Sequence, residues 1–197
     1  MILPQSFYRN PTPSVARNIL GCHLLHRQEE GITGGRIVET EGYLFRDPAA
    51  RSFPGKTEKN ATLFGPPGHA YVYLVYGLHL LFNIVTGENN PGEAVLIRAL
   101  EPCEGIPVME ARRGTRDVQQ LCRGPGNLTK ALGITRACNG YPLYSGNALT
   151  VISADGLSGY TPVAPADIVQ TTRVGLHTAK SRPLRLYIKG NEYVSRV

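Results

Sequence analysis

The sequence predicts a single domain with a mixed fold of α-helices and β-strands (α+β). Its 197 residues are enough to enclose one substantial hydrophobic core without disulfides or metals. The 22 glycines and 15 prolines make up nearly a fifth of the chain, which favours short elements joined by tight turns over a long helical bundle. Both the two-residue period of strands and the period of helices occur along the chain. We therefore expect one domain that spans residues 1–197.

One helix and one strand are predicted near the start of the chain. Thr12 followed by Pro13 is typical of the cap and first turn of a helix, and apolar residues then recur at helical spacing. Residues 36–44 alternate in a strand period, so that Glu39 and Glu41 share one face. The residues around them are apolar, which leaves the two carboxylates little apparent exposed surface.

A long loop and a β-hairpin are predicted next. Residues 46–67 are polar and rich in proline, glycine and charge, as is typical of a functional loop inside a compact domain. Residues 70–87 carry β-branched and aromatic residues on either side of Tyr76 and Gly77, which form the natural turn point. We expect Tyr76 at or near the hairpin tip and Asn83 in an apolar return strand.

The rest of the chain is predicted to hold a core strand, short helices and further strands. Residues 93–102 form an apolar strand interrupted by Arg98, a charge that needs a partner when buried. Residues 105–122 indicate one or two short basic helices, and the glycine-rich segment beginning at Gly124 leads into another helix. Further strands are expected at residues 148–153, 168–176 and 184–189.

The charge balance favours a polyanionic partner, with nucleic acid as the first candidate. The 21 lysines and arginines outnumber the 15 aspartates and glutamates, which gives a net charge of +6 and a pI near 9.3. Many basic proteins bind no polyanion, so charge alone leaves the partner open.

The sequence also argues against a secreted, membrane or metal-binding protein. The N-terminus does not resemble a secretory signal, and the longest apolar stretch is too short and interrupted to cross a bilayer as a helix. The four cysteines and five histidines show no metal-ligand spacing. We expect a cytoplasmic protein, associated with the nucleoid if it is bacterial, with no metal site.

Two groups of residues are candidates for chemistry. Glu39 and Glu41 are spaced for a pair of carboxylates in one site, although solvent-facing strands often show the same spacing. The hairpin tyrosines offer flat faces for a nucleobase, and Tyr76 at the turn is placed to act as a wedge between base pairs. The alternative is that these tyrosines form a hairpin core. For Asn83, structural bracing and base recognition are both open.

Five ordered motifs resemble the alkyladenine, or 3-methylpurine, DNA glycosylase family. They read IVETEGY, NATLFGPPGHAYVYLVYG, FNIV, LIRALEP and CRGPGNLTKALGI, and the likeness continues through RVGL and PLRLYIKG. It covers nearly the whole chain from Arg36 onward. The resemblance implies a curved antiparallel β-sheet with flanking helices and a protruding hairpin that intercalates in DNA. It also implies an enzyme that works without a metal or a cofactor.

The resemblance implies roles for the residues of the strand motifs. Glu41 matches the catalytic base that activates the water attacking the sugar, with Glu39 in a supporting role. Arg98 matches the arginine that helps to hold this water. Tyr43 and Tyr73 match the aromatic residues that sandwich the extruded purine.

The hairpin and the loop before it complete the implied site. Tyr76 matches the wedge that fills the vacated place in the duplex, and Asn83 matches a pocket amide that disfavours the exocyclic amine of normal guanine. The family's usual pocket histidine is replaced here by Arg51. Three roles are open for this cation: repelling a cationic base, donating to a neutral base, or contacting phosphate.

The resemblance implies a monofunctional glycosylase of base excision repair that acts on double-stranded DNA with damaged purines. We expect a monomer, because the sequence indicates one DNA-binding face and no dimer seam. It would extrude 3-methyladenine, 7-methylguanine or hypoxanthine and hydrolyse the N-glycosidic bond to leave an abasic site. The motif holds no lysine near Glu41, which predicts no lyase activity. The alternatives are a catalytically impaired module that binds damaged DNA, and a hydrolase of free nucleosides or small glycosides.

Overall fold

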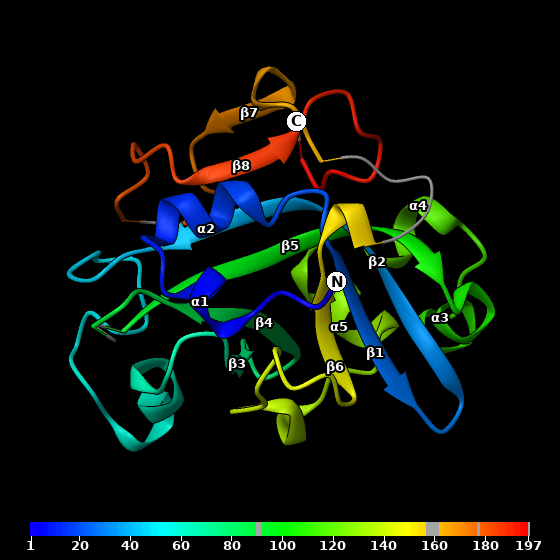
Figure 1. The fold of residues 1–197 in the computed structure, drawn as a ribbon, viewed down its shortest axis with the longest axis horizontal. Coiled ribbons are helices and arrows are strands. Elements are labelled where there is room, and N and C mark those ends of the chain that lie inside the picture. The colour runs from blue at the N-terminus through cyan, green and yellow to red at the C-terminus, as the bar shows by residue number, and fades with distance from the viewer. Residues whose placement is uncertain (90–91, 157–161, 177, 197) are drawn as a thin grey trace.

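A curled antiparallel β-sheet forms the centre of the protein in the computed structural model, which describes residues 1–89, 92–156, 162–176 and 178–196 (Figure 1). Among these residues the sheet has eight strands. Six follow the order β3-β4-β5-β2-β1-β6, while β8 pairs with both β2 and β7. The strands are β1 His23–Gln28, β2 Gly31–Tyr43, β3 Ala70–Val75, β4 His79–Thr86, β5 Glu93–Glu104, β6 Leu149–Ile152, β7 Ile168–Thr171 and β8 Arg185–Ile188.

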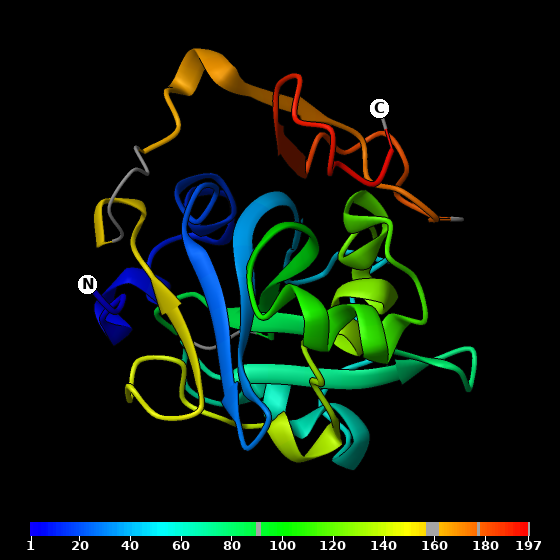
Figure 2. The ribbon, with the colours of Figure 1, turned by 90° about the vertical axis from the view of Figure 1, so that its right-hand side faces the viewer.

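Short helices cover both sides of the sheet. Helix α2 packs against β2 and β5 on one side, and α5 packs against β4 and β5 on the other (Figures 1 and 2). The α-helices are α1 Gln5–Tyr8, α2 Thr12–Asn18, α3 Ile106–Arg113, α4 Val118–Leu121 and α5 Pro125–Ala131, and the 3-10 helices are η1 Glu58–Phe64, η2 Arg136–Cys138, η3 Ala154–Gly156 and η4 Pro165–Asp167. The predicted α+β class, with one compact domain around a curved antiparallel sheet, is confirmed.

The core lies between the sheet and these helices, because the strands and helices turn their apolar residues inward. Ile37 of β2, Phe82 of β4 and Ile97 of β5 have no exposed surface, and neither does Leu128 of α5. Burial of each large apolar side chain contributes about 1.5–3 kcal/mol. The long pairing of β2 with β5 thus provides a rigid support for the side chains that these two strands carry.

The pairing of β2 with β5 is irregular at the predicted carboxylate pair. The register shifts on both sides of Glu39, which leaves Val38 and Arg98 outside the paired positions. Such bulges bend a strand and change the direction of its side chains. Strand β8 pairs with β2 over Glu39–Glu41, so this bent part of β2 lies between two strands.

Hairpin β3–β4 extends away from the body of the protein (Figure 2). Its strands pair up to Val75 and His79, so the turn consists of Tyr76, Gly77 and Leu78. Both Tyr76 (φ 51°) and Gly77 (φ 69°) adopt left-handed backbone conformations, which a tyrosine adopts less readily than a glycine. Tyr76 is 86% exposed.

Several local predictions are wrong. Thr12 is not the cap of α2, because Pro11 holds that position; the Thr12 hydroxyl instead bonds the Thr86 hydroxyl (2.8 Å) and the Glu93 carboxylate. The expected loop at 46–67 contains η1, whose start is closed by reciprocal bonds between Thr57 and Asn60. Helix α1 was not expected, and the strand predicted at 168–176 ends at Thr171.

Candidate active site

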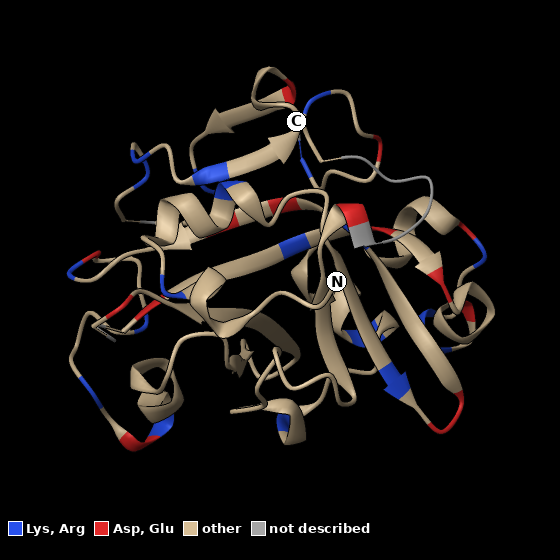
Figure 3. Ribbon diagram, viewed as in Figure 1, with Lys and Arg blue, Asp and Glu red and all other residues tan. Residues whose placement is uncertain are grey.

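Glu39 lies at the centre of a buried network of charges where β2 meets β5 and β8. Its Oε1 accepts hydrogen bonds from the Nε atoms of Arg98 (3.1 Å) and Arg185 (2.6 Å), and its Oε2 accepts one from the backbone N–H of Ser195 (2.7 Å). The carboxylate has no exposed surface. Figure 3 shows acidic positions on β2 beside a basic position on β5. Glu39 therefore holds the two arginines in place and is not positioned to contact a ligand.

Glu41 is also fully buried, but its partners differ from those of Glu39. Its Oε1 accepts from the backbone N–H of Val174 (2.7 Å). Its Oε2 accepts from the Tyr43 hydroxyl (2.9 Å) and lies 3.3 Å from Arg98 Nη1. Burial raises the pKa of the Glu41 carboxyl above its ordinary value, while Arg98 and the hydrogen bonds act in the opposite direction. The prediction that both carboxylates share one face is confirmed, because Arg98 contacts both.

A cleft of about 510 Å³ lies next to the residues that bind Glu41, and we name it the central cleft. Its lining includes all three partners of the Glu41 carboxylate: Tyr43, Arg98 and Val174. The first residues of α5, the hairpin residue Tyr76 and the loop residue Arg51 complete its walls. Glu41 itself does not line the cleft, so its carboxylate lies behind the three partners that do.

Two tyrosines of the cleft each have an arginine over the ring. The Arg51 guanidinium lies 4.6 Å from the ring centre of Tyr73, and that of Arg173 lies 4.7 Å from the ring centre of Tyr43. Tyr71 stacks near Tyr73, with the ring centres 5.0 Å apart. Stacked guanidinium groups cover flat faces that a planar base also fits. Arg51 therefore occupies one face of Tyr73 in this structure.

Asn83 lies away from the central cleft, beside a much smaller cavity of about 20 Å³. This cavity is also lined by Tyr43, Arg51 and Tyr73, and its volume is sufficient for about one water molecule. The Asn83 side chain donates to the backbone carbonyl of Tyr71 (3.2 Å). The structure thus brings Tyr43, Arg51, Tyr73, Tyr76 and Arg98 together around the cleft, and places Asn83 behind its wall.

The sequence did not predict the contacts that Arg173 and Val174 make with the residues around Glu41. Arg173 is buried, forms an ion pair with Asp47 (2.6 Å) and donates to the Gly42 carbonyl (3.1 Å), which fixes it over Tyr43. Burial tends to raise the pKa of Asp47, but its bond to Arg173 holds that pKa below the ordinary value. The RVGL motif pointed to this segment without indicating a role. The side chain of Arg173 and the backbone N–H of Val174 make these contacts from the segment that follows β7, which ends at Thr171.

The part of the chain that the structure describes places no group of three or more His, Cys, Asp or Glu side chains where they could hold a metal ion. No helix within that part has the length and apolar character needed to cross a bilayer. The four cysteines are free thiols.

The chain is similar to known proteins over its whole length. Residues 6–192 match the model of a family described as methylpurine-DNA glycosylase. A protein of Methanoculleus marisnigri is 54% identical over 196 residues, with full coverage of both chains, and one of Carboxydothermus hydrogenoformans is 44% identical with the same coverage. Both relatives carry the provisional name of 3-methyladenine DNA glycosylase.

Proposed function

Because the chain belongs to the methylpurine-DNA glycosylase family, we propose that its central cleft receives a damaged purine nucleotide extruded from duplex DNA. The chain is a DNA glycosylase, a hydrolase of N-glycosyl bonds that acts in DNA repair. The proposal adds the substrates 3-methyladenine, 7-methylguanine and hypoxanthine, and the release of the base with an abasic site left in the DNA.

The observation that carries the proposal is the arrangement of acceptors and donors around Glu41. A carboxylate has about four acceptor positions, and Val174, Tyr43 and Arg98 account for three of them. One position on Oε1 therefore stays free for a water molecule. Arg98 reaches both Glu41 and the cleft, so its guanidinium can orient that water toward the sugar.

Bond cleavage then follows from charge and geometry. The N-glycosidic bond breaks through a state with positive charge on the sugar, which the ionised Glu41 carboxylate stabilises at close range. Glu41 accepts a proton from the water as the water oxygen bonds to C1′ of the sugar, and the base leaves with the bonding electron pair. The raised pKa of Glu41 makes it a better proton acceptor than an ordinary glutamate.

Extrusion of the nucleotide requires the hairpin. Inserting the exposed Tyr76 ring into the duplex offsets part of the few kcal/mol needed to unpair and unstack a base. The extruded base then stacks on Tyr73 once Arg51 has moved aside or has moved onto the base itself. No lysine is among the residues that line the cleft in the described chain, which supports a monofunctional enzyme. Borohydride trapping of a covalent adduct between enzyme and DNA would contradict this.

Single-turnover release of the base from a duplex carrying one damaged purine tests the proposal. We expect Glu41→Gln to lower the rate by about 10²–10⁴-fold, because the amide cannot accept the proton. The matched control is Glu29→Gln, which makes the same change at an exposed position. A Glu41→Gln enzyme that releases base at the wild-type rate would rule out Glu41 as the base.

A second candidate function, a module that binds damaged DNA without cleaving it, is favoured by the position of Arg51. Its guanidinium covers the face of Tyr73 on which a base would stack. The cavity behind that wall is too small for a purine. This candidate predicts tight lesion binding by the wild type with no release of base, so the same experiment decides between the two.

A further inference from the structure

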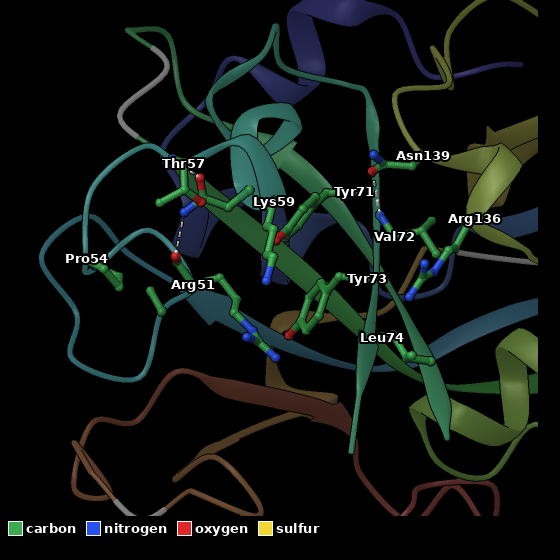
Figure 4. Close-up of a pocket in the computed structure, with 12 residues that line it drawn as sticks. Arg51, Pro54, Thr57, Lys59, Tyr71, Val72, Tyr73, Leu74, Arg136 and Asn139 are labelled. Carbon is green, nitrogen blue, oxygen red and sulfur yellow. Dashed lines mark hydrogen bonds between the residues drawn. The ribbon is translucent and has the colours of Figure 1, made fainter. Parts of the chain in front are cut away.

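A second and larger cavity lies along the free edge of strand β3, next to the central cleft. Its volume is about 590 Å³, and its walls come from the loop before η1, from η1 itself, from β3 and from η2 (Figure 4). It shares Arg51 and Tyr73 with the central cleft, so the two spaces adjoin. We name it the basic cavity, after the residues Arg51, Lys59 and Arg136 in its lining.

The charge of the basic cavity has one sign. Its three cations come from separate segments of the chain, and their charged ends point toward the space in front of β3 (Figure 4). The lining contains no aspartate or glutamate. Within the described residues, none of Arg51, Lys59 and Arg136 forms an ion pair. Three convergent cations without an acidic partner favour an anionic ligand.

Strand β3 adds backbone donors to the same space because it is the edge strand of the sheet. On this edge, Ala70 bonds to the segment around Tyr141, and the Val72 N–H donates to the Asn139 side chain (3.0 Å). Val72 is the last residue of this edge whose N–H has such a partner among the described residues. Since alternate residues of an antiparallel strand turn their N–H groups to the same edge, the Leu74 N–H also points toward the basic cavity.

We propose that the basic cavity binds backbone phosphates of the DNA duplex that the tip of the hairpin enters. Leu74 is two residues from Tyr76 at the tip, a span of about 7 Å along a strand. A duplex entered by Tyr76 thus has its backbone within reach of the free edge of β3. The inference rests on the proposed function only in that the ligand is DNA held by the hairpin.

The salt dependence of DNA binding tests the site. The double variant Lys59→Gln/Arg136→Gln removes two exposed cations and leaves Arg51, which also lines the central cleft, in place. We expect the slope of log Kobs against log salt to fall in magnitude by about 2, equally for damaged and undamaged duplexes. The loss is measured in the affinity for DNA and its salt dependence, because phosphate contacts position the DNA.

The control variant is Arg27→Gln/Lys189→Gln, which removes the same charge from two exposed positions that line neither space. A slope for Lys59→Gln/Arg136→Gln that equals the control slope overturns the proposal. Inorganic phosphate that binds the wild type but not the double variant, with an unchanged DNA slope, assigns the cavity to free anions and also overturns it. Lack of base release by the wild type would refute the proposed function but not the phosphate site, because the slope is measured from binding without cleavage.

Discussion

Glu39 and Glu41 lie two residues apart on β2, yet their carboxylates have different hydrogen-bond and charge partners. Glu39 accepts from two arginines and one backbone N–H, so two positive charges lie against its carboxylate. Glu41 shares one arginine and receives one phenol and one backbone N–H. A carboxylate with fewer positive neighbours in a buried site holds a proton more readily. These surroundings support the proposed roles of Glu41 as the base and Glu39 as its support.

Arg98→Gln should move the acid limb of the pH–rate profile to higher pH. The guanidinium favours the ionised form of Glu41, so its loss raises the pKa of Glu41 further. Base release needs the ionised form, which exists above that pKa, and activity is therefore lost at a higher pH on acidification. Single-turnover rates across the acidic range measure the limb.

Arg98→Lys provides the matched control for this shift, because it keeps a cation beside Glu41. Its acid limb should lie between those of the wild type and Arg98→Gln. Circular dichroism checks that both variants fold, since Arg98 also pairs with Glu39. Identical limbs for all three folded enzymes would show that Arg98 does not tune Glu41.

Arg51→Gln should raise the excision of cationic 7-methylguanine relative to neutral hypoxanthine by about tenfold, because a charge at the wall of a cleft repels a like charge. The measured quantity is the ratio of the two single-turnover rates. Lys56→Gln removes an exposed cation from the same loop without touching the cleft and serves as the control. An unchanged ratio would indicate that Arg51 leaves Tyr73 and the base entirely when DNA binds.

At the scale of the elements, hairpin β3–β4 carries the exposed Tyr76 ring at its turn. We expect Tyr76→Ala to slow base release from duplex DNA by about tenfold to a hundredfold, because the vacated place in the stack stays empty. Stability should change by less than about 0.5 kcal/mol, since the ring is 86% exposed.

Phe53→Ala is the control for the hairpin, because it removes an aromatic ring that is 55% exposed and lies outside the cleft. A fluorescent base analogue placed beside the lesion reports extrusion directly. If Tyr76→Ala extrudes the damaged base as fast as the Phe53→Ala enzyme, then the wedge role is wrong.

The sequence predicted those elements whose signals are local. Alternation over 36–44 predicted the face shared by Glu39 and Glu41, and the β-branched runs around Tyr76 predicted where the strands turn. The bulge at Glu39 and the use of the Thr12 hydroxyl depend on partners from distant strands, so no local pattern could reveal them. The same reason explains why residues 172–176 read as a strand when they instead turn into the site.

At the scale of the whole molecule, the Asp47–Arg173 pair ties the loop after β2 to the segment after β7. Asp47→Asn should lower the free energy of unfolding by about 3–5 kcal/mol, because it leaves the buried guanidinium without a counter-charge. The pKa of Asp47 is below its ordinary value, so its contribution to stability is present near neutral pH and is lost as the pH falls through that lowered pKa.

Urea denaturation of Asp47→Asn, with Asp167→Asn as an exposed control, measures this loss. The double variant Asp47→Asn/Arg173→Met should regain part of the stability, because it removes the unpaired charge. A single variant as stable as the control would mean that Arg173 finds another counter-charge.

The bonds that reach Glu39 from late in the chain also bear on when a newly made molecule completes its buried network of charges. Two of its partners, Arg185 and Ser195, follow 146 and 156 residues after it. At about 5–20 residues per second, synthesis leaves the carboxylate without them for about 7–30 s. A chain still being made on the ribosome therefore lacks these two bonds to Glu39. We therefore expect fragments that end before Ser195 to lack base-releasing activity.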